Sequence, residues 1–488
     1  MSMQVQQAAV LKNLVGDRWV LPEGAPHEDV PNPATGEVLA RVPHSAAAHV
    51  DAAVRAAAAA FPAWRATPVV ERARLMFRYK ALLEDHLEEL SRLVTAENGK
   101  TLDEARGEVR RGIEVVEFAC GMPTLMMGQV LEDVARGVDS ELIRVPVGVV
   151  AGICPFNFPA MIPLWMFPVA LAAGNTFVFK PSERTPITGV RLAELLLEAG
   201  APAGVLNVVH GARETADALL AHPAIRAVSF VGSAPVAEYV YRTAAAHGKR
   251  VQALAGAKNY LIVMPDADLD VTVPAVIASA FGNAGERCLA GSVVEAVGEI
   301  ADPLVARLGE AAARLRLGAG TDSATELGPV IRAAHRDRIV GYIERGLQEG
   351  ARLVTDGRRA MSDSTGGFFI GATVFDLVRP EMALAQDEIF GPVLGVIRSR
   401  SLDEAIEHAN RSRFGNMAAI FTRSGKAARE FRTRIEAGMV GINVGVPAPM
   451  AFFPFSGWKG SFYGDLHATG RDAVEFYTEK RVVTSRWP

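Results

Sequence analysis

The chain has 488 residues, which is too long for a single hydrophobic core and predicts two or three domains. A hydrophobic content of 49% and a charged content of 22% are ordinary for a globular protein in water. The net charge of −4 gives no electrostatic basis for binding nucleic acid. The three cysteines (120, 154 and 288) are too few and too scattered for a disulfide framework or a zinc site. We therefore expect no metal, and a reducing, cytoplasmic compartment.

Two stretches were considered as targeting or membrane segments. Met1–Gly16 lacks the charged start, apolar stretch and cleavage site of a signal peptide. Val145–Phe179 is largely apolar, but prolines and asparagines interrupt it, whereas a spanning helix needs about 20 apolar residues. We expect no membrane association, and interpret Val145–Phe179 as buried strand, turn, helix and strand.

Strands and helices alternate over most of the chain. A hairpin turn at 32–36 precedes helical patterns at 46–61, 70–98 and 102–120. From Arg144, β-like runs at 145–153, 176–179, 205–209 and 227–231 alternate with helical patterns at 160–173, 186–199, 213–221 and 234–245. This order predicts an α/β fold with a doubly wound parallel sheet, which binds ligands at the carboxyl ends of its strands. A second alternating region, 268–394, is interpreted as the catalytic domain.

The C-terminal tail ends in a β-like run, Arg481–Trp487. An exposed strand of this kind needs an edge to pair with. Together with Leu131–Val145 it predicts a β-strand oligomerisation arm.

The stretch Phe281–Ser292 presents one cysteine beside one arginine. Cys288 follows a helical run and lies among glycines, which leave an open approach. The neighbouring Arg287 is expected to lower the pKa of the thiol. Two adjacent charges, Glu286 and Arg287, argue against a buried structural cysteine. Cys288 is therefore the candidate nucleophile.

The Gly-x-Gly-x-x-Gly fingerprint of dinucleotide-binding folds does not follow any strand. Instead, a strand leads through Gly232 and Ser233 into a helix. Gly232 would let a pyrophosphate approach the backbone, and Ser233 would cap the helix. Lys180 and Glu183, after a buried strand, can bind ribose hydroxyls. A carboxylate there disfavours a 2′-phosphate, so NAD is expected rather than NADP.

These segments resemble the aldehyde dehydrogenase superfamily, over nearly the whole chain. The Gly-x-Arg-Cys form of 285–288 is similar to its methylmalonate-semialdehyde dehydrogenase branch. The resemblance implies a Rossmann-like NAD-binding domain (1–123 and 146–253), an α/β catalytic domain (254–453) and an oligomerisation arm (124–145 and 454–488), assembled as a homodimer or homotetramer. It implies the following cofactor-binding residues: Cys154, Phe156, Lys180, Glu183, Arg184, Gly232, Ser233, Ala255, Glu388 and Phe390.

The resemblance also assigns the chemistry. Cys288 would attack the aldehyde, and the Asn157 amide and the Cys288 N–H would stabilise the oxyanion. Arg111 and Arg287 would bind a substrate carboxylate, because guanidinium groups match its geometry. The implied substrates are malonate or methylmalonate semialdehyde, converted to acetyl-CoA or propionyl-CoA with loss of CO2.

Leu254 stands where hydrolytic members of the superfamily carry a glutamate. Water needs such a base, whereas a thiol with a pKa of about 8.5 is already partly ionised near neutrality. Coenzyme A is therefore the expected acyl acceptor. Three alternatives stand beside this one. The first is a hydrolytic enzyme with Glu388 as its base, and the second is a non-catalytic protein of the same fold. The third, a cysteine hydrolase, is disfavoured because His247, the nearest candidate base, is expected to be exposed.

Overall fold

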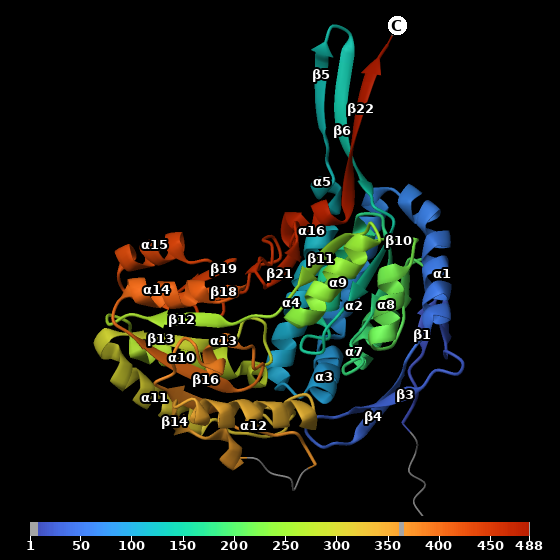
Figure 1. Ribbon diagram of the computed structural model, residues 1–488. Coiled ribbons are helices and arrows are strands. Elements are labelled where there is room, and N and C mark those ends of the chain that lie inside the picture. The colour runs from blue at the N-terminus through green and yellow to red at the C-terminus, as the bar shows by residue number, and fades with distance from the viewer. Residues whose placement is uncertain (1–7, 361–365, 488) are drawn as a thin grey trace, which may run out of the picture.

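The computed structural model describes residues 8–360 and 366–487, so the first part of the Met1–Gly16 segment lies outside it. Two large β-sheets with their helices form the body, and a thin three-stranded arm projects from it (Figure 1). None of the helices in these ranges combines the length and apolar character needed to cross a bilayer.

The first sheet has eight strands in the order β2-β1-β9-β8-β7-β10-β11-β21. They are β1 (Asn13–Val15), β2 (Arg18–Val20), β7 (Val149–Ile153), β8 (Thr176–Lys180), β9 (Leu206–Val208), β10 (Ile225–Val231), β11 (Arg250–Leu254) and β21 (Phe462–Gly464). The five central strands are parallel and the outer ones antiparallel. The direction of winding reverses between β7 and β10, which is where such sheets bind ligands. The predicted doubly wound sheet is confirmed.

Helices cover both faces of this sheet. They are α1 (Ala47–Ala66), α2 (Val69–Asp85), α3 (Leu87–Asn98), α4 (Leu102–Cys120), α5 (Met122–Leu125), α6 (Met161–Ala172), α7 (Ile187–Glu198), α8 (Arg213–Ala221) and α9 (Ala234–Ala246). Along β7, Val149, Ala151 and Ile153 pack into one core and Val150 into the other. Because both faces are buried, the strand is apolar throughout.

Two predicted boundaries are wrong. The helix expected over 70–98 is two helices that meet at His86, whose imidazole lies 2.6 Å from Glu89 in the first turn of α3. The strand expected over 145–153 is also divided. Val145 and Pro146 belong to the arm, and β7 begins only at Val149 after Gly148, which has a φ of 132°.

The second sheet has seven strands in the order β14-β15-β16-β13-β12-β18-β19, all parallel except β14. They are β12 (Asn259–Val263), β13 (Gly291–Val297), β14 (Arg352–Thr355), β15 (Thr373–Asp376), β16 (Val393–Ser399), β18 (Met417–Phe421) and β19 (Met439–Ile442). Its helices are α10 (Leu269–Phe281), α11 (Ala301–Arg314), α12 (Ala333–Gln348), α13 (Ala383–Gln386), α14 (Leu402–Arg411) and α15 (Gly425–Arg434). The shorter elements are the predicted hairpin β3 (His27–Pro31) and β4 (Val38–Pro43), the pair β17 (Phe414–Gly415) and β20 (Trp458–Lys459), and α16 (Gly470–Phe476).

The arm consists of β5 (Gln129–Ala135), β6 (Val138–Pro146) and β22 (Thr478–Arg486), in the order β22-β6-β5 (Figure 1). The tail strand pairs antiparallel with β6 along its whole length, as the sequence predicted. Leu131 and Val482 are more than half exposed, at 64% and 65%. The division into domains stays a proposal, and β21, within 454–488, pairs with β11 of the first sheet.

A buried ion pair joins α4 to the loop before α6. Lys100 Nζ lies 2.6 Å from Glu108 Oε2 and donates to the Asn157 carbonyl at 2.8 Å. The other Glu108 oxygen accepts the backbone N–H groups of Ala160 and Met161 at 2.8 and 3.2 Å. Both side chains of the pair are almost completely buried. Each charge therefore depends on the other for compensation.

Lys100→Met should lower the free energy of unfolding by about 3–5 kcal/mol, because it leaves the Glu108 carboxylate buried without a counter-charge. Urea unfolding followed by tryptophan fluorescence would measure the loss. The double variant Lys100→Met/Glu108→Gln keeps an acceptor for the two N–H groups and buries no charge. It should recover most of the stability, and an undiminished loss would contradict this account.

Candidate active site

Cys288 lies on the loop that connects α10 to β13. A tight turn, η1 (Gly282–Gly285), precedes it, with Asn283 and Ala284 both at a φ of 51°. The Cys288 carbonyl accepts two side-chain amides, from Asn259 and Asn416, each at 2.9 Å. The cysteine is partly exposed. The loop is thus fixed from β12, through Asn259, and from the residue just before β18, Asn416, which gives the sulfur a defined position.

The expected lowering of the Cys288 pKa is wrong for this structure. Burial, together with the nearby Glu388 carboxylate, raises the pKa of the thiol to about 12. The backbone N–H groups of Cys288 and Leu289 and the charge of Arg287 act in the opposite direction but do not compensate. Arg287 is engaged elsewhere, since its Nη2 lies 2.9 Å from Glu104.

Glu286 is buried, although its charge, next to that of Arg287, predicts an exposed segment. This side chain is completely buried, and burial raises its pKa to about 8, so the neutral form predominates at neutrality. One carboxyl oxygen accepts the N–H of Ile331 at 3.2 Å. His335 Nε2 lies 3.3 Å from the same oxygen. Glu286 is therefore part of the packing beneath the loop.

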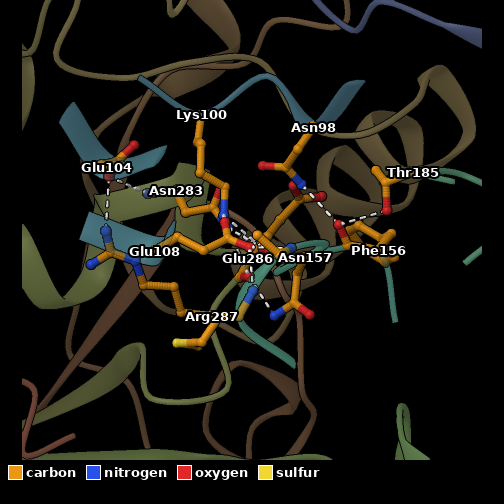
Figure 2. A network of polar contacts seen from close by, with 12 residues as sticks. Asn98, Lys100, Glu104, Glu108, Phe156, Asn157, Thr185, Asn283, Glu286 and Arg287 are labelled. Carbon is orange, nitrogen blue, oxygen red and sulfur yellow. Dashed lines mark hydrogen bonds and ion pairs between the residues drawn. The ribbon is translucent and has the colours of Figure 1, made fainter. Parts of the chain in front are cut away.

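Asn157 follows β7 and contacts the nucleophile loop directly. Its Nδ2 donates to the Glu286 carbonyl at 3.0 Å. Its own carbonyl accepts Lys100 Nζ and, at 3.3 Å, Asn283 Nδ2. Figure 2 shows these contacts as part of one polar network. The structure therefore brings Asn157 and the Cys288 loop together, as the sequence predicted.

Cys288 opens into a cavity of about 280 Å³. Both predicted substrate arginines line it, together with apolar side chains that include Phe158, Trp165 and Phe455. Arg111 Nη2 donates to the carbonyls of Ala448 and Pro449 at 3.1 and 2.9 Å. Its Nη1 lies 3.4 Å from Glu114 Oε2. A cation is thus held near the thiol from each of two elements, α4 and the nucleophile loop.

Sequence reasoning missed the acidic side of this cavity. Glu104, Glu108 and Glu114 all line it. Only Glu104 had a local signature, because Thr101-x-x-Glu104 is the pattern of a helix-capping box. The roles of Lys100, Glu108 and Asn283 depend on contacts between distant segments, which no local pattern reveals.

The predicted cofactor residues gather at the carboxyl ends of the central strands of the first sheet. Lys180 ends β8, and its Nζ lies 3.0 Å from the Pro181 carbonyl and 3.5 Å from Glu183. A side chain on Gly232, after β10, would place Cβ 2.4 Å from the Phe230 ring, so only glycine fits. Arg184 Nε has no hydrogen-bond partner among the described residues.

The structure differs from the sequence prediction that Ser233 caps a helix. It occupies the N-cap position of α9, but within the described ranges its side chain makes no capping bond. The first N–H groups of α9 therefore keep their capacity to bind an anion. Ser233 is exposed, so a ligand can reach this helix end.

Of the remaining predicted cofactor residues, Cys154 and Ala255 directly follow β7 and β11 of the first sheet. The Phe156 ring packs edge-on against Phe390 at 5.9 Å, and Arg184 lies over it at 5.1 Å. Cys154 is buried, with its N–H on the Lys180 carbonyl at 3.1 Å. Ala255 donates its N–H to the Ser461 carbonyl at 2.9 Å.

Glu388 and Leu254 bear on the fate of an acyl group on Cys288. Glu388 accepts the N–H of Ala257 at 2.9 Å, and burial raises its pKa to about 7. Leu254, at the end of β11, is only 4% exposed and packs into the core. The position of the hydrolytic base is therefore apolar here.

Comparison with known proteins agrees with this geometry. The aldehyde dehydrogenase family model matches residues 19–483. The malonate-semialdehyde dehydrogenase 2 of Geobacillus thermodenitrificans is 63% identical over 480 residues, covering 98% of this chain and 99% of the relative. The crystal structure of a methylmalonate-semialdehyde dehydrogenase from Oceanimonas doudoroffii is 50% identical, with a TM-score of 0.97 and coverage of 98% and 99%. A Sinorhizobium meliloti protein assigned to that enzyme type and solved with NAD is 47% identical, with a TM-score of 0.97 and coverage of 99% of both chains. The chain belongs to the aldehyde dehydrogenase family.

Proposed function

We propose that this enzyme oxidises malonate or methylmalonate semialdehyde with NAD and transfers the acyl group to coenzyme A. The products would be acetyl-CoA or propionyl-CoA and CO2. The observation that carries the proposal is the placing of Cys288, Arg111 and Arg287 around one small cavity. The substrates named for the relatives, which carry a carboxylate beside the aldehyde, fit that combination.

The attack creates an oxyanion that needs hydrogen-bond donors. The Cys288 thiol, whose pKa is about 12, must first lose its proton; the resulting thiolate would add to the aldehyde carbon and give the anion of a thiohemiacetal. An amide nitrogen carries two hydrogens, and Asn157 uses one on the Glu286 carbonyl. The second, with the Cys288 backbone N–H, would stabilise the oxyanion. Loss of one such donor typically lowers the rate about 100- to 1,000-fold.

The NAD site is supported by a cradle that fits a dinucleotide. Gly232 and the N-terminus of α9 suit a pyrophosphate, and Lys180 and Glu183 suit ribose hydroxyls. Glu388 would hold the second ribose, and Phe390 would pack beside the nicotinamide. When bound, NAD supplies the hydride acceptor that converts the thiohemiacetal to a thioester on Cys288.

Release of the acyl group favours a thiol acceptor. Leu254 gives no carboxylate for activating water, and a thiol needs less help from a base. The β-carboxy thioester on Cys288 would lose CO2 and take up one proton. The coenzyme A thiol would then attack the thioester carbonyl and displace the Cys288 sulfur, which gives the shorter acyl-CoA and regenerates the free cysteine. Hydrolysis remains the second candidate, since Glu388, with a pKa of about 7, is poised to act as a base near neutrality.

We also propose that the enzyme is a cytoplasmic homo-oligomer, a dimer or tetramer, assembled through its arm. The two edges of the arm sheet, β5 and β22, offer unpaired backbone groups. Leu131 and Val482 are exposed on it. The three cysteines are free, in keeping with a reducing compartment.

Coenzyme A should increase NADH formation from malonate semialdehyde strongly, with acetyl-CoA identified by mass as the product. The control is the same assay with propanal, with and without the thiol. Equal turnover without coenzyme A, giving a free acid, would mean that the enzyme is hydrolytic and would point to Glu388.

Arg111→Leu should lower the ratio of kcat/KM for malonate semialdehyde to kcat/KM for propanal about 10- to 100-fold, because a hydrogen-bonded charge pair is lost. Arg110 is the matched control. It is the neighbouring arginine on α4, but its side chain is 54% exposed, with Glu84 at 3.7 Å. Arg110→Leu should leave the ratio unchanged. If Arg111→Leu affects both aldehydes equally, Arg111 does not bind the carboxylate.

Val482→Asp should reduce the mass measured by light scattering, because it places a charge on an apolar part of the proposed contact. Val482→Thr keeps the side-chain shape and the β propensity, and should leave the assembly intact. An unchanged mass for Val482→Asp would exclude this surface from the interface.

A further inference from the structure

Arg287 is held in one direction by two residues to which the sequence assigned no role. We propose that Glu104 and Gly282 are specificity-determining positioning residues, which aim the Arg287 guanidinium at the carboxylate of the substrate. The inference rests on the proposed function of Arg287 in binding that carboxylate.

Glu104 has its carboxylate anchored at the start of α4. Its Oε2 accepts both the N–H and the hydroxyl of Thr101 at 3.1 Å, which completes the capping box. The other oxygen, Oε1, accepts the N–H of Asn283 at 2.7 Å and Nη2 of Arg287 at 2.9 Å. Figure 2 shows Glu104 between the helix and the arginine. The direction of Oε1 is therefore set by the helix cap, and Arg287 follows it.

Gly282 provides the space in which the guanidinium lies. A Cβ at this position would lie 2.3 Å from Nη1 of Arg287 and 2.5 Å from Cζ. The φ of Gly282 is −55°, which any residue can adopt. The backbone conformation therefore does not require glycine here, but the position of the arginine does. The guanidinium occupies the place that a side chain of residue 282 would fill.

These contacts leave Arg287 with donors for a ligand. A guanidinium has five N–H groups. Glu104 takes one at Nη2, and the carbonyl of Ala278 lies 3.4 Å from Nη1. The side chain still lines the cavity with Cys288.

A single helix fixes both cations. Arg111 is a residue of α4, and Glu104 holds Arg287 from the first turn of the same helix. Residues of α4 therefore contribute to the positions of both guanidinium groups, and so to the distance between the aldehyde and the carboxylate that the site would recognise.

The test is Gly282→Ala, which acts on the arginine rather than on the fold. The atoms it displaces are the far end of a flexible side chain, so the Tm should stay within about 2 °C of the parent value. The ratio of kcat/KM for malonate semialdehyde to that for propanal should fall about 10- to 100-fold, mainly through KM. Gly341→Ala, in α12 with open space around its Cβ, is the control and should change neither.

Two more variants separate this inference from the proposed function. Glu104→Gln removes the charge and leaves a single acceptor oxygen, which can serve either Thr101 or Asn283 but not both, and should lower the same ratio. Gly282→Ala added to Arg287→Leu should lower the ratio no further, because its effect acts through Arg287.

A normal ratio in Gly282→Ala, beside a lowered ratio in Arg287→Leu, would overturn the inference and leave the proposed function standing. Equal losses for both aldehydes in Gly282→Ala would also overturn it, since the role would then be structural. Equal losses in Arg287→Leu would instead remove the carboxylate-binding role itself.

Discussion

The catalytic geometry depends on one buried cation. Lys100 has almost no contact with solvent, and its charge is compensated by Glu108 and by the Asn157 carbonyl. Asn157 is bonded in turn to the loop that carries Cys288. Moving the Cys288 loop away from the first sheet would break the hydrogen bonds of Asn157 with Glu286 and Asn283. Lys100 fixes the Asn157 backbone, and Asn157 in turn contacts the loop that carries Cys288.

The charges around Cys288 come in pairs, so the cations do little to offset the burial that raises the pKa of its thiol. Arg287 faces Glu104, Arg111 faces Glu114, and the buried Lys258 lies near Glu388. The cations are mostly spent on these acids, so little net positive charge reaches the sulfur. A positive charge added close to the sulfur would favour the thiolate and lower the pKa. The ion pairs fix the directions of Arg111 and Arg287, while the thiol stays mostly protonated near neutrality.

Local sequence patterns predicted the strands and helices, because these depend mainly on residues that are close together in the sequence. Apolar runs broken by glycine and proline marked the parallel strands, and the carboxyl ends of those strands placed Lys180, Gly232 and Asn157 correctly in space. The wrong or missing predictions concern residues whose surroundings come from distant parts of the chain. A glutamate is normally ionised at neutral pH, but Glu286 is buried by distant segments and is mostly neutral. The position of Arg287 likewise depends on Glu104, 183 residues away in sequence, and no periodicity links the two.

The choice of acyl acceptor follows from an absence of charge at one strand end. β11 ends in Leu254, which is packed into the core, so the thioester on Cys288 would have no carboxylate on that side. The nearest alternative, Glu388, is bonded to the N–H of Ala257 and only partly ionised near neutrality. Water depends on a strong base, whereas a thiol brings a substantial ionised fraction of its own. A thiol acceptor needs less help from a base than water does, and this is the physical basis for proposing coenzyme A as the acyl acceptor.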